Sequence, residues 1–188
     1  MKETEVTVQV FDTFEKTDEI LRSQGFRLKD SYVIFDRYFS KHANVAALSY
    51  EELIGGSFLV RTVETGKPSH KLIYKKKLLD ENGTVVSEEK VKTDLGDADE
   101  AVRIFALSGL EPYCELRNRS FIYEHANVCL ALQVVDGLGT FIEYEEDETM
   151  KGLGDEEKIR RLTDVLTSLG LKLGSDFSCK KVYMMLHK

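Results

Sequence analysis

Two glutamates, Glu143 and Glu145, are separated by one residue near the end of the segment 127–146. Side chains alternate between the two faces of a β-strand, so in a strand both carboxylates lie on one face and Ile142 and Tyr144 lie on the other. Asp136-Gly137 and the following Gly139 tolerate positive φ, which predicts a hairpin with arms at residues 128–135 and 140–146. Carboxylate oxygens on one face of a strand can hold a hard divalent cation such as Mg²⁺.

The overall composition limits the classes of protein and partner. The chain has 188 residues, of which 42% are hydrophobic and 31% are charged, and it is expected to form one domain over residues 1–188. A net charge of −7 argues against a nucleic acid or an anionic membrane as the partner and favours a small molecule. The three cysteines lack metal-ligand spacing, and no apolar leader or membrane-spanning segment is evident. We therefore expect a soluble cytoplasmic protein.

The elements that position the glutamates follow from alternation, caps and turn residues. Apolar-polar alternation between turn signals predicts strands at residues 3–10, 26–40, 58–64, 70–79, 84–93, 111–124, 128–135 and 140–146. Helical spacing and cap residues predict helices over residues 14–24, 97–107 and 155–169. Asn82-Gly83 is a strong signal for a hairpin between two of the strands. Residues 41–56 are expected to form a loop or a short helix.

These elements indicate an α+β chain dominated by antiparallel sheet, with enough strands to close a barrel. One face of successive strands carries charged residues: Glu3, Glu5, Arg61, Lys71, Lys75, Arg117, Arg119, Glu143 and Glu145. An ordinary half-buried sheet with a wet outer face would give the same pattern. The sharper interpretation is a polar barrel interior, in which carboxylates bind divalent cations and basic side chains bind phosphates.

Several segments of the chain, taken in order, resemble the CYTH superfamily. The first strand, KETEV, resembles the Glu-x-Glu-x-Lys signature of these triphosphate tunnel metalloenzymes, and LQVVDGLGTFIEYE is similar to their closing hairpin. FDRYF, FLVRTV, LIYKKK, ELRNRSFIY and CKKVYMML resemble further family segments in the same order. The resemblance spans nearly the whole chain and is nearest to class IV adenylyl cyclase-like proteins.

The resemblance implies an eight-stranded antiparallel β-barrel, the triphosphate tunnel, with helices packed outside. It implies Mg²⁺ or Mn²⁺ as cofactor, and it places the metal-binding acids at Glu3, Glu5, Glu143 and Glu145. It places the triphosphate-binding bases at Arg61, Lys75, Arg117 and Arg119, with Lys180 or, preferably, Lys181 added to them. These side chains are expected to converge on one cavity. No catalytic residue is assigned.

Two positions depart from the family pattern. The signature lysine is Thr7, and the aspartate expected before the closing hairpin is Gln133. Phosphoryl and nucleotidyl transfer depend on positioning and on charge neutralisation, so these departures bear more on turnover than on binding.

The leading hypothesis is a metal-dependent enzyme acting on ATP, tripolyphosphate or another organic triphosphate such as a thiamine triphosphate-like compound, by cyclase or triphosphatase chemistry. The first alternative is a binding module for nucleotides or polyphosphate with little turnover. The second is an interaction protein of the α+β class with polar outer faces. The oligomeric state stays open, and a homodimer is compatible with the chain.

Overall fold

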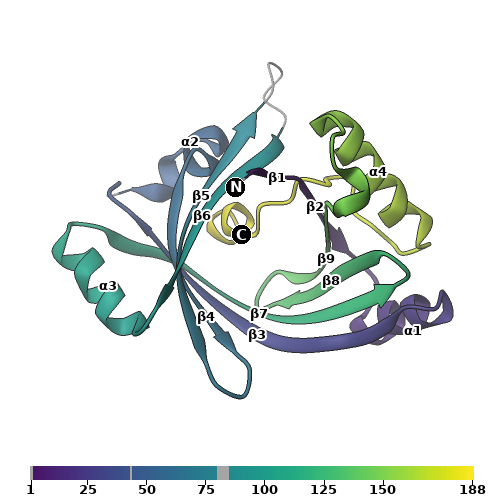
Figure 1. Ribbon diagram of the computed structural model, residues 1–188. Helices are drawn as coiled ribbons and strands as arrows, with labels where there is room; N and C mark the ends of the chain where they lie inside the picture. The colour runs from purple at the N-terminus through teal and green to yellow at the C-terminus, as the bar shows by residue number, and fades with distance from the viewer. Residues whose placement is uncertain (1, 43, 80–84) are drawn as a thin grey trace.

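The strands form one antiparallel sheet that curls on itself in the computed structural model, which describes residues 2–42, 44–79 and 85–188 (Figure 1). The strand order is β1-β6-β5-β4-β3-β7-β8-β9-β2. The strands are β1 (Lys2–Glu3), β2 (Glu5–Val10), β3 (Arg27–Ser40), β4 (Ser57–Glu64), β5 (Ser69–Leu79), β6 (Val85–Leu95), β7 (Glu111–His125), β8 (Val128–Val135) and β9 (Gly139–Glu145).

The first stretch of the chain joins the two ends of this sheet. β1 pairs with β6 and β2 pairs with β9, and only Thr4 separates the two short strands. Counted as one interrupted strand, they give the eight-stranded antiparallel barrel expected from the sequence, and that prediction is confirmed. Glu3 and Glu5 consequently pair with different strands: Glu3 lies against β6, and Glu5 lies against β9.

Five α-helices accompany the described part of the sheet: α1 (Phe14–Ser23), α2 (Tyr50–Ile54), α3 (Ala98–Leu107), α4 (Asp155–Ser168) and α5 (Lys181–Leu186). The three helices predicted from the sequence correspond to α1, α3 and α4. Thr13 caps α1 and Asp97 caps α3 through their side chains, as expected. Residues 45–47 and 50–54 form short helices, which agrees with the expectation for 41–56. The sequence analysis did not anticipate α5.

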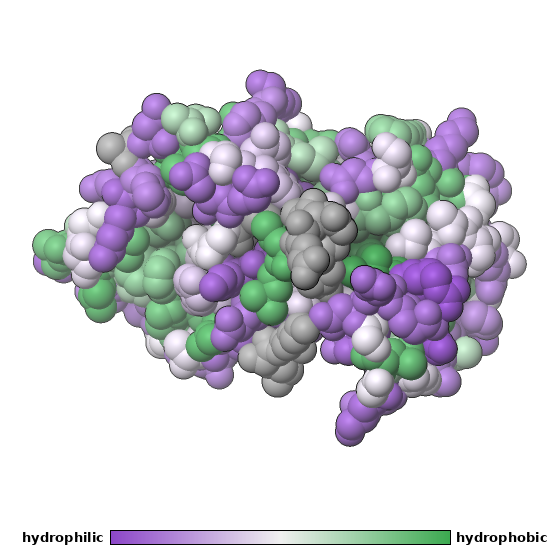
Figure 2. Space-filling model, turned by 90° about the horizontal axis from the view of Figure 1, so that it is seen from above, coloured by the Kyte–Doolittle hydropathy of each residue, from purple (hydrophilic) through white to green (hydrophobic). Residues whose placement is uncertain are grey.

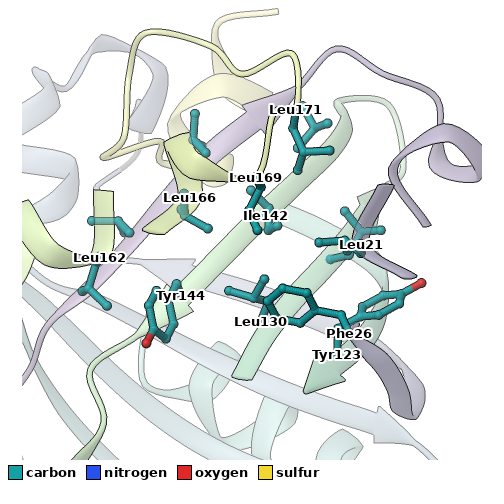
Figure 3. Close-up of a cluster of buried hydrophobic side chains, with 14 of the residues drawn as sticks. Leu21, Phe26, Tyr123, Leu130, Ile142, Tyr144, Leu162, Leu166, Leu169 and Leu171 are labelled. Carbon is teal, nitrogen blue, oxygen red and sulfur yellow. The ribbon is translucent and has the colours of Figure 1, made fainter. Parts of the chain in front are cut away.

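The outer side of the barrel is apolar beneath α4. Leu162 and Leu166 of this helix are fully buried, and they belong to one cluster with Ile142 and Tyr144 of β9 and with Val8 of β2. Figure 3 shows the α4 leucines beside Ile142 and Tyr144. Because side chains alternate along a strand, outward apolar residues on β2 and β9 turn the residues between them inward. This packing therefore orients the glutamates of both strands toward the barrel interior.

Part of the barrel interior is also apolar, because α5 lies on that side of the sheet. Val182 of α5 packs in a buried cluster with Leu59, Ile73 and Phe141, which come from β4, β5 and β9. Figure 1 places the C-terminal helix between the two walls of the curled sheet. The helices are therefore not all outside: α1, α3 and α4 cover outer faces, and α5 fills one part of the interior.

The two hairpins join the strands that the sequence predicted to pair. Gly137 and Gly139 have φ values of 77° and 101° in the β8–β9 turn, a backbone conformation that favours glycine. β5 and β6 pair from His70↔Leu95 to Leu79↔Val85, as the turn signal required, while Asn82-Gly83 lies outside the described residues. None of the helices in the described ranges is long and apolar enough to cross a membrane.

The face seen in Figure 2 carries both hydrophilic and hydrophobic atoms, and one hydrophobic group lies at the left end, where α3 lies in Figure 1. Ile104 and Leu107 of α3 are exposed, with 81% of Leu107 accessible to solvent. The opposite side of α3 packs against Phe39 and Val60 through Phe105. The helix thus covers the outer face of the sheet with one side and leaves an apolar side open.

Candidate functional site

A cavity of about 400 Å³ opens in the barrel interior beside α5. Its acidic lining comes largely from β2, β3, β6 and β9, and its basic lining from β4, β5, β6 and the C-terminal segment. The basic residues that line it are Arg61, Lys75, Lys77, Lys90, Lys180 and Lys181. Acids and bases therefore share one interior space, as the sharper interpretation of the sequence requires.

Three carboxylates lie close together in this cavity. Glu5, Glu143 and Glu145 each offer an oxygen within 4.8 Å of the other two. The pKa of Glu145 is raised by burial and then by the negative charges of Glu143 and Glu5. Mutual repulsion of this kind is relieved by a cation, and carboxylate oxygens are the ligands that Mg²⁺ and Mn²⁺ prefer. The three side chains fit a divalent metal ion.

Glu5 is also held by an ion-pair network with the lysines. Lys77 Nζ donates to Glu5 at 2.9 Å and lies 2.7 Å from a carboxylate oxygen of Glu88. Burial alone would raise the pKa of Glu5, but the positive charges of Lys77, Lys75, Lys180 and Lys90 together hold it well below its usual value. Glu5 is therefore ionised at neutral pH and available to a cation.

The pKa of Lys180, a basic residue that lines the cavity, is lowered. Burial and then repulsion from Lys77 lower its pKa to about 7, and attraction to Glu5 and Glu88 acts in the opposite direction. The same carboxylates raise the pKa of Lys77. Lys180 therefore exchanges its proton near neutral pH, while Lys77 stays charged.

Lys181 connects the C-terminal helix with the two positions that depart from the family pattern. Its Nζ donates to Gln133 Oε1 and, at 3.2 Å, to Glu143 Oε2. Thr7 Oγ1 donates to the same Glu143 oxygen at 3.2 Å. Thr7 and Lys181 therefore both contact Glu143, a metal-ligand candidate, and Gln133 is linked to it through Lys181.

Arg61 lines the cavity and forms an ion pair with Asp36, a residue that was not selected from the sequence. Its Nε and Nη2 donate to the two carboxylate oxygens of Asp36, each at 2.7 Å. Such a bidentate pair fixes the guanidinium and neutralises most of its charge locally. Lys75 is more weakly engaged, since its Nζ lies 3.7 Å from Glu88. Lys75 is thus freer than Arg61 to meet an anion.

Glu3 does not join the three clustered carboxylates. Its side chain pairs with Lys90, because β1 lies against β6 while Glu5 belongs to β2 and faces β9. The interruption at Thr4 separates the two acids of the first-strand motif. The expectation that Glu3 converges with the other acids on one metal position is therefore wrong, although its partner Lys90 lines the cavity.

The expectation that Arg117 and Arg119 face the cavity is also wrong. Both are exposed, and Arg117 pairs with Glu64 at 3.1 Å. Arg117 lies opposite Phe35 on β3, whereas its neighbour Leu116 lies opposite the inward Asp36. Cross-strand partners point to the same face, so the odd-numbered residues here point outward. The inward positions of this stretch are instead Leu116, Asn118 and Ser120.

Several cavity residues were missed at the sequence level, although some carried a signal. Lys77 has the same strand parity as Lys75, so the alternation rule could have added it. Glu88 and Lys90 have the same spacing on the partner strand and lie opposite Lys77 and Lys75. Lys180 was considered only as an alternative to Lys181, and both line the cavity. Asp36 lies in the segment FDRYF, which resembles a family segment, but no role was assigned to it from the sequence.

Comparison with known proteins agrees with this architecture. The sequence profile of the CYTH domain matches residues 56–177. No curated protein matches the sequence. The PH1819 protein of Pyrococcus horikoshii OT3 superposes with a TM-score of 0.76 at 19% identity, covering 98% of each chain.

Two further solved structures are similar in fold. A candidate adenylate cyclase of Vibrio parahaemolyticus superposes with a TM-score of 0.66 at 14% identity, covering 99% of this chain and 98% of that chain. The candidate adenylyl cyclase HpAC1 of Hippeastrum, described as having a dominant triphosphatase activity, gives 0.65 at 15%, covering 98% and 95%. These identities show a shared fold. The domain match covers more than half of the chain, so this protein belongs to the CYTH family, whose members bind triphosphates and generally depend on metal ions.

Proposed function

We propose that this protein is a metal-dependent enzyme that cleaves a triphosphate bound in the barrel cavity. The observation that carries the proposal is the meeting of three clustered carboxylates, Glu5, Glu143 and Glu145, with six basic side chains in one interior space. Carboxylates alone could bind many kinds of cation, and lysines alone could bind many kinds of anion, so neither group by itself indicates the ligand. Their combination fits a polyanion that is bound together with a divalent cation.

In this proposal the acidic side chains bind the metal ion and the basic side chains bind the phosphates. Glu5, Glu143 and Glu145 would hold Mg²⁺ or Mn²⁺, which supplies charge neutralisation at the phosphate oxygens when bound. Lys75 and Lys77 on β5 and Lys181 on α5 line the cavity and would bind phosphate oxygens as point charges. Phosphoryl transfer needs this positioning and neutralisation more than it needs covalent help from the protein. We therefore assign binding roles and no single catalytic residue.

The reaction itself depends on the nucleophile that reaches the phosphorus. In triphosphatase chemistry, water attacks the terminal phosphorus, the bond to the bridging oxygen breaks, and the diphosphate part of the substrate leaves. In cyclase chemistry, the ribose 3′-hydroxyl of ATP attacks the α-phosphorus, loses its proton, and displaces pyrophosphate. Both use the same neutralised triphosphate. The three free thiols fit a reducing compartment, so we place the reaction in the cytoplasm.

A binding module with little turnover is the second candidate, and Thr7 and Gln133 favour it. Thr7 supplies no positive charge near the phosphates, and Gln133 supplies a neutral amide where the family pattern has an acid. Gln133 also engages Lys181, which then has less freedom to follow a substrate. Affinity can survive such changes while the transition state loses its contacts.

Product analysis distinguishes the candidates. The purified protein is incubated with ATP or tripolyphosphate and with Mg²⁺ or Mn²⁺, and the release of phosphate, pyrophosphate and cyclic nucleotide is measured. Turnover that requires the metal supports the enzyme, and metal-dependent binding without products supports the module. The double variant Glu143→Gln with Glu145→Gln should lose the metal dependence, while Glu115→Gln, at an exposed position of β7, should keep it. Absence of both binding and turnover would contradict both candidates.

A further inference from the structure

Two exposed apolar surfaces lie next to each other on the outside of the barrel. The first, the helix face, consists of Ile104 and Leu107 of α3, which are 60% and 81% exposed. Residues three apart lie on the same side of a helix, so the two side chains form one surface. The other side of α3 packs on β4 and β5, and Figure 1 shows the helix outside the curled sheet, away from α1 and α4. The helix face therefore projects from the barrel.

The second surface, the sheet strip, consists of Phe58, Tyr74 and Val91 on β4, β5 and β6. Phe58 lies opposite Tyr74, and Tyr74 lies opposite Val91, so all three point to the same face of the sheet. The ring of Phe58 lies 4.9 Å from that of Tyr74 and 6.2 Å from that of Phe105 on α3, which places the strip on the outer face. Phe58 is 40% exposed and Val91 is 59% exposed. The strip therefore continues from beneath α3 into solvent.

The helix face and the sheet strip are complementary in kind. A helix side with apolar residues at this spacing packs on the apolar face of a sheet, as α3 itself does with its other side. Within one chain the two surfaces cannot pack on each other, because Phe105 turns the opposite side of α3 toward the sheet. In a twofold pair of chains the helix face of each copy can lie on the sheet strip of the other, and the same contact forms twice.

The charges beside the two surfaces also favour a second copy. On α3, Glu100 and Arg103 lie 3.9 Å apart, and both side chains are more than half exposed, so this pair is weak. Next to the sheet strip, Lys76 and Glu89 lie opposite each other on the same face, and both are exposed. Each surface therefore carries one acid and one base that can pair with those of the other. An anionic membrane or a nucleic acid would instead meet these acids and a chain of net charge −7.

We infer that two copies of this chain associate about a twofold axis, with the helix face of each copy on the sheet strip of the other. The inference does not depend on the proposed function. It has a consequence for the cavity, because Lys75 and Lys90 follow Tyr74 and precede Val91 in the chain and point to the opposite face of the same strands. The interface would cover the outer side of the two strands that carry these cavity lysines.

Sedimentation velocity of the full chain over a range of protein concentrations tests the inference. The wild type should approach twice the monomer mass of 21.4 kDa at high concentration and return to the monomer on dilution. Leu107→Glu and Val91→Glu should each raise the dissociation constant of the dimer about a hundredfold or more, because the twofold axis buries each new charge twice. Phe11→Glu replaces a side chain that is 65% exposed and belongs to neither surface, so it should leave the dissociation constant unchanged. Melting temperatures establish that each variant is folded.

Cross-linking identifies the surfaces that meet. Chains labelled with ¹⁵N are mixed with unlabelled chains, and a carbodiimide joins lysines directly to carboxylates in contact. Peptides that link Lys76 of one isotope to Glu100 of the other should appear in the wild type and disappear in Leu107→Glu. A wild type that stays monomeric at every concentration would overturn the inference and leave the proposed function standing. Dimers that persist in both glutamate variants, an equal loss in Phe11→Glu, or links between other surfaces only would also overturn it.

Discussion

Binding of a triphosphate should draw one proton from solution at mildly alkaline pH, and Lys180 should be the group that takes it. Burial and the charge of Lys77 lower the pKa of Lys180 to about 7, so at pH 8 only about one tenth of the molecules carry this proton. A triphosphate placed beside Lys180 brings negative charge that favours the protonated form. Ligand binding and proton binding are therefore coupled.

The size of the effect follows from the charges. A unit negative charge about 4 Å away stabilises an ammonium by about 4 kcal/mol at an effective dielectric constant of about 20, which corresponds to about three pKa units. The pKa of Lys180 would rise from about 7 to about 10 in the complex, and protonation at pH 8 would become nearly complete. Binding should take up about 0.9 proton at pH 8 and close to none at pH 5.5, where Lys180 is already charged.

Calorimetry measures this proton directly. Tripolyphosphate with Mg²⁺ is titrated into the protein at pH 8 in several buffers that differ in their enthalpy of protonation, and the observed enthalpy is plotted against that quantity. The slope gives the number of protons taken up. Lys180→Met should reduce the slope to near zero, while Lys172→Met, at an exposed position of the same segment, should leave it unchanged. A zero slope for the wild type, or an unchanged slope for Lys180→Met, would refute the assignment.

Other consequences of the structure can be measured separately. Lys75→Met should weaken tripolyphosphate binding about tenfold or more, whereas Arg117→Met should change it less than about twofold, because only Lys75 lines the cavity; similar losses in titrations of both variants would contradict the assigned faces. The double substitution Thr7→Lys with Gln133→Asp should raise kcat for ATP or tripolyphosphate more than it changes KM, and steady-state kinetics with an unchanged kcat would show that neither position limits turnover. Leu166→Ala should lower the free energy of unfolding by about 2–5 kcal/mol at constant denaturant slope in urea titrations, and a loss below about 1 kcal/mol would mean that the α4 contact contributes less than its burial indicates.

The sequence predicted most elements because their local signals agreed with their tertiary positions. Thr13 and Asp97 cap helices where side-chain oxygens reach free backbone N–H groups. The β8–β9 hairpin depends on Gly137 and Gly139, whose positive φ is a local property of the turn. Such features need no knowledge of distant contacts. The α5 helix was missed because it has six residues and depends on packing inside the barrel.

The site was predicted in part, and the errors have a common cause. Glu5 and Glu143 could be placed because one face of each strand is clearly apolar. β7 gave no such contrast: Leu116, Asn118 and Ser120 alternate with Arg117 and Arg119, and only pairing with β3 decides which set faces inward. Asp36 and Glu88 were not selected, because their ion pairs with Arg61 and Lys77 join residues that are separated in the sequence and lie on different strands.

The ion pairs of the cavity link metal binding to triphosphate binding under the proposed function. Lys77 bonds to Glu5 and Lys181 bonds to Glu143, so in this structure each lysine neutralises a carboxylate that a divalent cation would need. A cation at the carboxylates would weaken both pairs and release the lysines toward phosphate oxygens. Conversely, phosphates that draw the lysines away leave the carboxylates unneutralised and strengthen their attraction for the cation. Each ligand must then raise the affinity for the other by the same factor, since coupling free energies are reciprocal. The self-neutralised cavity thus favours binding of the metal and the triphosphate together over binding of either one alone.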